Sequence, residues 1–181
     1  MSELSMAALA VAQGEMARGV RGGLYPYGRF RSPDIDAYMT LAGMPPHPDV
    51  GAEGRPWCAA GVFACFVRAV RDVVSVDDTD TPAAVPQVPC PRTAGALHMW
   101  ELSPLTARTQ LPAPTDVFVL DHGKGRGHVG FVLNVSPDGK TITTIEPDTN
   151  AAGSTTGDAW GQHLWQPADG TRGRLVGYLA F

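Results

Sequence analysis

The chain reads Arg55-Pro56-Trp57-Cys58-Ala59-Ala60-Gly61-Val62-Phe63-Ala64-Cys65-Phe66-Val67, an apolar run that begins directly after a Pro-Trp pair. The break at Pro56 places Cys58 in the first turn of a helix, which we expect to continue to about Val73. At this end of a helix the backbone N–H groups lack intrahelical acceptors and the dipole is positive, so a thiolate is favoured. A cysteine in a helix is more often a core residue, so Cys58 becomes a candidate nucleophile only if the chain also supplies a base and a group that orients it.

Two predicted strands further along the chain carry a histidine and a carboxylate. The segments His128–Ser136 and Thr141–Ile145 have the composition of strands, and Pro137-Asp138-Gly139 between them is a turn signal. A hairpin folded there makes His128 and Glu146 cross-strand neighbours on one face. Taken singly, these residues read as a packed strand histidine and a solvated strand end. Together with Cys58 they form the nucleophile, base and orienting group of covalent catalysis.

These motifs, in this order, resemble the CHAP family of cysteine amidases and endopeptidases of peptidoglycan, which are relatives of NlpC/P60. The segments that carry the resemblance are Pro56-Trp57-Cys58-Ala59-Ala60, Asp116-Val117-Phe118-Val119, Gly127-His128-Val129-Gly130-Phe131-Val132 and Ile145-Glu146-Pro147-Asp148-Thr149-Asn150. The resemblance covers nearly the whole chain and implies one catalytic domain over residues 1–181.

The resemblance also implies a role for each residue of the site. Cys58 would be the nucleophile, His128 the base and Glu146 the orienting group. Asp148 stands where the family usually has asparagine. The last polar contact of the site is therefore expected from Asp148 or from nearby Asn150.

The order of the predicted elements favours an α+β fold. Helices are expected at 6–20, with Ser5 as a cap, and at 34–41, 58–73 and 93–102; strands are expected at 116–120, 128–136, 141–145 and 175–181. Helices early and strands late indicate helices packed on an antiparallel sheet. The resemblance makes this a papain-like fold of the NlpC/P60 type.

Other residues have weaker signals. Trp57 is a candidate wall of the substrate cleft, and Gln13 a candidate oxyanion contact. We assign the remaining histidines to the surface or to packing, and we interpret Gly123-Lys124-Gly125-Arg126-Gly127 as a flexible lip before His128, because it lacks the full phosphate-loop pattern. These remaining histidines are His47, His98, His122 and His163. The tryptophans expected in the core are Trp100, Trp160 and Trp165.

Composition and spacing exclude several classes of function. A chain of 181 residues with 44% hydrophobic residues is long enough for one folded domain, and a net charge of −4 offers no attraction to nucleic acid or anionic lipid. A zinc site formed by Cys58, His128 and Glu146 or Asp148 is not supported, because the sequence has no CxxC or HExxH spacing. A calcium site at Asp78 and Asp80 is not supported either, because the glycine and the closing glutamate of an EF-hand are missing. We therefore expect no metal, no cofactor and no nucleic-acid or membrane partner, and we expect a monomer.

The three cysteines cannot all pair. Cys58 and Cys65 lie roughly 10 Å apart along one helix, beyond the reach of a disulfide. Cys65 reads as a small buried hydrophobe. Cys90 reads either as an exposed free thiol or as a partner of Cys65.

The expected function is hydrolysis of an amide bond in the peptide stem of peptidoglycan. A non-catalytic wall-binding module of the same fold and a phage-type endolysin are the alternatives. The start of the chain lacks the pattern of a signal peptide, and no run is long enough to span a bilayer. A substrate in the cell wall then favours export as an antibacterial effector that acts in the periplasm of a target cell, with an immunity protein as its partner.

Overall fold

The computed structural model describes residues 2–23, 28, 30–45, 54–74, 87–150, 152 and 157–181. Its α-helices are α1 (Glu3–Ala17), α2 (Pro33–Leu41), α3 (Cys58–Val74) and α5 (Ala96–Leu102), with short 3-10 helices η3 (Leu105–Ala107) and η4 (Pro167–Asp169). Its strands are β1 (Arg108–Thr109), β2 (Val117–Gly123), β3 (Arg126–Val135), β4 (Ile142–Thr149), β5 (Ala159–Trp165) and β6 (Arg174–Leu179).

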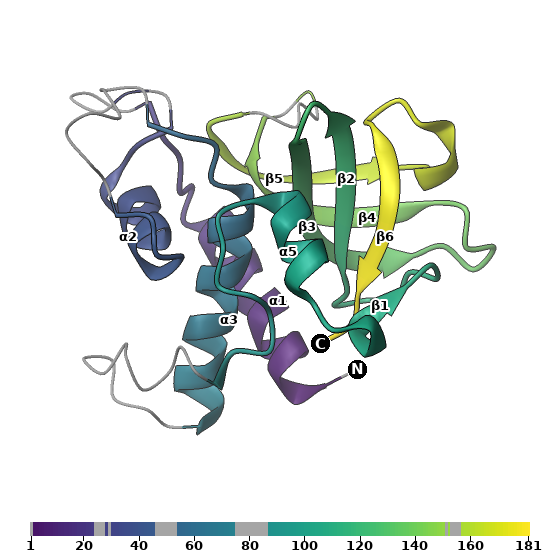
Figure 1. Ribbon diagram of the computed structural model, residues 1–181, viewed down its shortest axis with the longest axis horizontal. Helices are drawn as coiled ribbons and strands as arrows, with labels where there is room; N and C mark the ends of the chain where they lie inside the picture. Colours follow the sequence, from purple (N-terminus) through teal and green to yellow (C-terminus); the bar gives the residue numbers. More distant parts are fainter. Residues whose placement is uncertain are drawn as a thin grey trace.

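The strands form one antiparallel sheet in the order β1-β6-β2-β3-β4-β5. The helices α1, α2 and α3 gather on one side of this sheet, and α5 lies against β2 and β3 (Figure 1). Helices that precede an antiparallel sheet and pack on one side of it make an α+β fold, which confirms the predicted fold class.

The central helix is α3, which contacts α1, α2, β3 and β4. All its residues from Cys58 to Val67 are buried, which explains why this stretch of the sequence is apolar on every side of the helix. Phe66 packs against Phe131 of β3, with the two ring centroids 5.8 Å apart. The helix is thereby fixed to the strand that carries His128.

A glycine lets the first turn of α3 approach β4 closely. A Cβ added to Gly61 would lie 2.8 Å from Cβ of Pro147, closer than two carbon atoms can pack without strain. The position of Cys58 relative to β4 therefore depends on this glycine.

The two faces of the sheet bury different side chains. The face toward the helices carries Val117, Val119, Val129, Phe131, Ile145 and Leu179, and the other face carries Phe118, Leu120, Val132, Ile142, Trp165 and Tyr178. His128 lies beside Phe118, with 6.0 Å between ring centroids. Because side chains alternate along a strand, the imidazole of His128 emerges on the face opposite Val129 and Phe131.

Several expected elements differ in detail. The strands β1 and β5 were not predicted; β5 contains Gly161, Gln162 and His163, which interrupt the strand pattern. The cap of α1 is Ser2 rather than Ser5, because the Ser2 side chain accepts a hydrogen bond from the Ser5 backbone N–H and the helix begins at Glu3.

The supposed flexible lip is a tight turn. Lys124 and Gly125 join β2 to β3, and both have positive φ values, 57° and 72°. A two-residue turn in which both residues have positive φ matches the right-handed twist of the strands that it joins. The turn holds Arg126 at the first position of β3.

All three cysteines are free and buried. Cys90 is therefore neither an exposed thiol nor a disulfide partner of Cys65. The segment with Asp78 and Asp80 lies outside the described residues, as does His47. None of the described helices is both long and apolar enough to cross a bilayer.

Candidate active site

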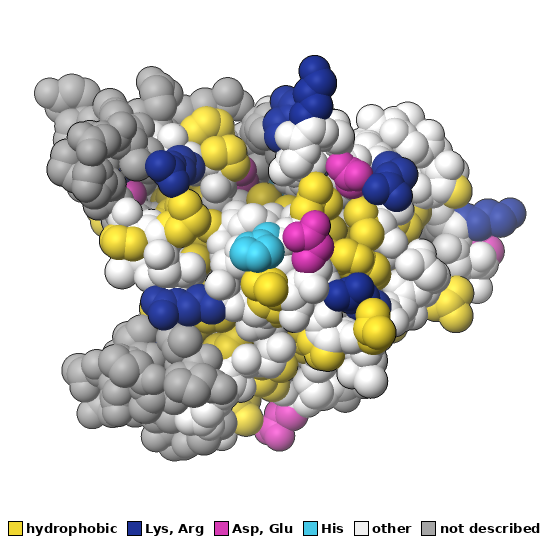
Figure 2. All heavy atoms as spheres, in the orientation of Figure 1, with side chains coloured by type: hydrophobic (Ala, Val, Ile, Leu, Met, Phe, Trp, Pro, Cys, Tyr) yellow, Lys and Arg dark blue, Asp and Glu magenta, His cyan; other side chains and the backbone are white. Residues whose placement is uncertain are grey.

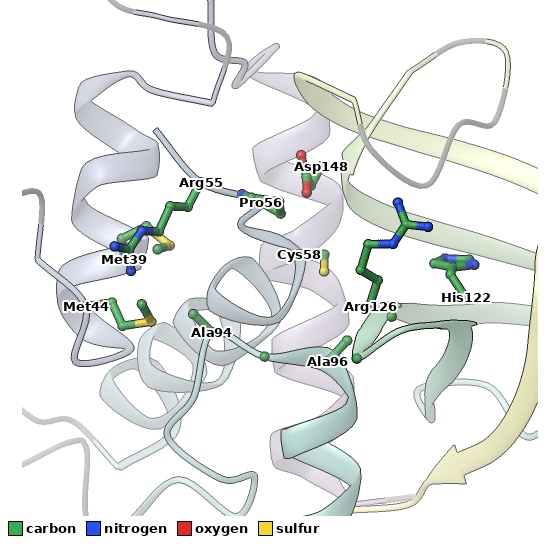
Figure 3. Close-up of a pocket in the computed structure, with 13 residues that line it drawn as sticks. Met39, Met44, Arg55, Pro56, Cys58, Ala94, Ala96, His122, Arg126 and Asp148 are labelled. Atoms are coloured by element: carbon green, nitrogen blue, oxygen red, sulfur yellow. The ribbon is translucent and has the colours of Figure 1, made fainter. Parts of the chain in front are cut away.

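Cys58 begins α3 and lies at a pocket of about 530 Å³. The pocket, called here the Cys58 pocket, is lined by Met39, Met44, Arg55, Pro56, Cys58, Ala94, Gly95, Ala96, His122, Gly125, Arg126, Gly127 and Asp148. Figure 3 shows the Cys58 side chain among Asp148, Arg126 and Ala96. Only 4% of Cys58 is exposed, so the thiol lies at the bottom of the pocket.

The surroundings of Cys58 do not favour a resting thiolate. Burial, followed by the charge of Asp148, raises the pKa of the Cys58 thiol to about 12. Backbone N–H groups of Val129, Ala59 and Cys58 itself oppose this rise in pKa. The helix start acts in the predicted direction, but the cost of burying the charge outweighs it. At neutral pH the resting thiol is protonated, and it needs a base.

His128 and Glu146 form the predicted pair. His128 Nε2 lies 2.9 Å from Glu146 Oε2, and both residues are fully buried. The hydroxyl of Thr144 donates to Glu146 Oε1 at 2.5 Å. Because an ionised carboxylate only accepts hydrogen bonds, His128 Nε2 carries the proton and Nδ1 of the neutral ring keeps its lone pair.

Arg172 completes the charge cluster around Glu146. Its two terminal nitrogens lie 2.6 and 2.7 Å from the two oxygens of Glu146. Burial alone would raise the pKa of Glu146, but hydrogen bonds from His128 and Arg172 lower it to about 2. The guanidinium also stacks over Trp165, 5.3 Å from the ring centroid. Arg172 therefore keeps Glu146 ionised and fixed in orientation.

The backbone of β3 connects the thiol to the imidazole. The Cys58 sulfur interacts with the backbone N–H of Val129, the residue next to His128. Pairing of β3 with β4 begins at Phe131 and Ile145, so His128 and Val129 lie beyond the paired part of these strands. Within the part of the chain that the structure describes, His128 Nδ1 is buried without a hydrogen-bond partner, and it makes no direct hydrogen bond with Cys58.

Of the two candidates for the last polar contact, the structure places Asp148 at the pocket. Asp148 is fully buried, and its Oδ2 accepts a hydrogen bond from the Trp57 backbone N–H at 3.2 Å. Its φ of 61° is uncommon for a residue other than glycine. Asn150 is half-buried and accepts from the Ala152 backbone N–H, and it does not line the pocket.

Trp57 and Gln13 do not lie where the sequence suggested. Trp57 is fully buried between Tyr38 and Trp160, with ring centroids 5.8 and 6.0 Å away. It supports the segment that leads to Cys58 and forms no wall of the cleft. Gln13 is exposed on α1 and does not line the Cys58 pocket.

Three residues of the pocket, Arg55, Arg126 and His122, receive no role in the site from the sequence analysis. For His122 the sequence predicts a place on the surface or in packing, whereas the structure places it at the pocket. Burial lowers its pKa, with further lowering by the nearby His128 and Arg126. Recognition of the two-residue turn at Lys124 and Gly125 would have placed His122 and Arg126 together at the ends of paired strands.

The described residues contain no group of three or more metal-ligating side chains that could hold an ion.

The α+β architecture, with a cysteine-started helix on an antiparallel sheet, is compatible with the papain-like class of fold. The model of the CHAP domain family matches residues 50–148, more than half of the chain, and the chain therefore belongs to the CHAP family. CHAP domains are typically amidases or peptidases that act on peptidoglycan. The matched range includes Cys58, His128, Glu146 and Asp148, but not Arg172. No curated protein and no solved structure matches the chain.

Proposed function

We propose that this protein is a cysteine amidase or endopeptidase that cleaves an amide bond in the peptide stem of peptidoglycan. Family membership supports the substrate. The observation that carries the catalytic assignment is the position of Cys58: it lies at a helix start, at the bottom of a pocket, and contacts the backbone beside an imidazole that Glu146 orients.

The first chemical step in this proposal is proton transfer from the Cys58 thiol to His128 Nδ1. Because the thiol is protonated at rest, the transfer accompanies attack on the amide carbonyl. His128 Nδ1 is buried without a hydrogen-bond partner among the described residues, and the ring lies beside Phe118 on the face of the sheet away from α3. The proposal therefore requires the imidazole to reach the thiol when substrate binds, as catalytic hydrogen bonds that are absent in a free enzyme often form only in its complex. The ionised Glu146 stabilises the imidazolium that results.

The backbone stabilises the tetrahedral intermediate. The N–H groups of Cys58 and Ala59 lie in the first turn of α3 and point toward the sulfur, so they are available to the oxyanion that forms on the attacked carbon. Each such donor contributes on the order of 3 kcal/mol in enzymes where it has been removed. His128 then protonates the leaving amine, and water hydrolyses the thioester with His128 again as base.

We also propose that residues 1–181 act as one catalytic domain. The helix α1 and the strand β6 lie outside the matched range, yet α1 packs on α3 and β6 pairs with β2. The effector route, a target-cell periplasm, an immunity partner and a monomeric state stay predictions.

Substitution of the three catalytic groups tests the proposal. We expect Cys58→Ser to abolish release of fragments from purified sacculi, His128→Ala to lower the rate about 10³-fold, and Glu146→Gln to lower it less. Mass spectrometry of the released muropeptides gives both the rate and the bond that is cut. Circular dichroism should show that Cys58→Ser remains folded.

The same assay separates the alternatives. Activity that survives EDTA but is lost to iodoacetamide removes a metalloenzyme. A wild-type protein that binds sacculi and releases no fragment would favour the binding module instead. Full activity in Cys58→Ser, or unfolding of that variant, would refute the catalytic assignment.

A further inference from the structure

Two arginines line the Cys58 pocket without any partner in the described part of the chain. Arg55 and Arg126 are exposed, and neither makes an ion pair or a hydrogen bond there. Other arginines of this protein are neutralised: Arg172 by Glu146 and Arg174 by Asp121, for example. An unpaired guanidinium at the mouth of a pocket presents a fork of N–H donors suited to a carboxylate.

The two arginines approach Cys58 from opposite sides. Arg55 precedes α3 by three residues, whereas Arg126 begins β3. Figure 3 shows their side chains on either side of the Cys58 side chain. The turn at Lys124 and Gly125 fixes the backbone of Arg126, and Figure 2 shows basic side chains projecting at the tip of this β2–β3 hairpin.

The rest of the pocket lining is mostly apolar. Met39, Met44 and Ala96 contribute to the wall, and methionine side chains adapt readily to an aliphatic chain. The one carboxylate among the lining residues, Asp148, is fully buried and holds the Trp57 backbone N–H. A ligand that enters the Cys58 pocket therefore meets the guanidinium groups of Arg55 and Arg126 on its two sides, and apolar side chains and the buried Asp148 between them.

We propose that Arg55 and Arg126 are specificity-determining residues that bind free carboxylates of the substrate on the two sides of the scissile amide. The substrate class is an acidic peptide that carries free carboxylates next to the bond that is cut. The inference rests on the proposed function for the identity of the chain that is bound. It assigns the recognition to charge rather than to the catalytic groups.

The test compares two synthetic stem peptides that differ only in one group: a free carboxylate beside the scissile amide, or its neutral primary amide. Affinity is measured calorimetrically with Cys58→Ser, which cannot turn over, and cleavage is measured with the wild-type catalytic residues. Because the pairs are partly solvated, we expect the acid to bind about three- to tenfold more tightly than the amide. Arg126→Gln or Arg55→Gln, combined with Cys58→Ser, should remove most of that preference.

Lys124→Gln is the matched control. Lys124 is an exposed cation in the same hairpin but does not line the pocket, so the variant should keep the full preference for the acid. Equal affinity for acid and amide, or a preference that survives both arginine substitutions, would overturn the inference. A preference for the acid that depends on the arginines, without cleavage by the wild-type protein, would support the inference and overturn the proposed hydrolysis.

Discussion

At the scale of single residues, Asp148 adds to the effect of burial that keeps the proton on Cys58. The carboxylate is fully buried, and its charge adds to the effect of burial on the pKa of the thiol. A negative group beside a nucleophilic sulfur slows ionisation, but it also favours an imidazolium formed nearby. The family usually has asparagine at this position. An asparagine would remove the negative charge that raises the pKa of Cys58 but would keep an oxygen that accepts a hydrogen bond from the Trp57 backbone N–H.

Asp148→Asn should therefore lower the pKa of Cys58. Burial is the larger cause of the rise, so the pKa should stay above the ordinary value of a thiol. At a pH below the pKa of Cys58, Asp148→Asn should react faster with iodoacetamide than the wild-type protein does, because a larger fraction of its Cys58 is the reactive thiolate. Peptide mapping by mass spectrometry distinguishes Cys58 from Cys65 and Cys90.

Asp138→Asn, in the exposed turn after β3, serves as the matched control and should leave the alkylation rate unchanged. An unchanged or slower rate in Asp148→Asn would show that the charge of Asp148 does not govern the thiol.

The sequence predicted the site residues that lie in motifs, but it did not predict the residues that contact them only in the folded chain. Order and spacing predicted the contact between His128 and Glu146, and the 2.9 Å distance confirms it. Arg172 lies beyond Glu146 by 26 residues, in a turn with no motif, so only the folded chain reveals it. The sequence also predicts that the helix start favours the thiolate of Cys58, and this is wrong for the resting protein. Burial by segments distant in the sequence raises the pKa of Cys58 more than the helix start lowers it.

At the scale of secondary-structure elements, the contact between α3 and β4 decides where the nucleophile lies. Gly61 is one turn into α3 and leaves room for Pro147 of β4. Strand pairing was readable wherever turn residues separated two apolar runs, as for β3 and β4. Strand β5 was not recognised because Gly161, Gln162 and His163 separate its two buried tryptophans and leave no apolar alternation. Its place depends on pairing with β4 rather than on its own pattern.

Gly61→Ala should destabilise the protein by about 1–3 kcal/mol, because the new methyl group would overlap Pro147 and force α3 away from β4. Displacement of the first turn should also lower activity. Urea unfolding measures the first effect and muropeptide release the second.

Gly14→Ala in α1 is the matched control. Nothing lies within 4 Å of the added Cβ there, so this variant should gain about 0.5–1 kcal/mol from helix propensity alone. Equal effects of the two substitutions would mean that the contact between Gly61 and Pro147 does not limit packing.

At the scale of the whole molecule, two buried carboxylates join separate segments. Glu15 of α1 accepts hydrogen bonds from Tyr38 of α2 and Arg68 of α3. Glu146 of β4 accepts from His128 of β3 and from Arg172, which precedes β6. One carboxylate thus links the helical layer, and the other links the sheet to the turn before its sixth strand.

Acid should weaken the fold through Glu146. Its pKa is lowered from 4.5 to about 2 in the folded chain, so its contribution is present above pH 4.5 and is lost as the pH falls toward 2. The loss amounts to about 3 kcal/mol for this shift. In Glu146→Gln this part of the pH dependence should be missing. Unfolding in urea between pH 5 and pH 2 compares the two proteins, and parallel curves would contradict the assignment.

The sheltered, protonated state of Cys58 has a consequence for the chemical durability of the protein. Peroxide and disulfide exchange attack the thiolate, and the first product of peroxide is a sulfenic acid. With a pKa of about 12 and 4% exposure, the sulfur of Cys58 is seldom in that form and seldom within reach. We therefore expect the resting protein to tolerate an oxidising medium without added reductant, since its sulfur becomes nucleophilic only in the presence of the bond that it cuts.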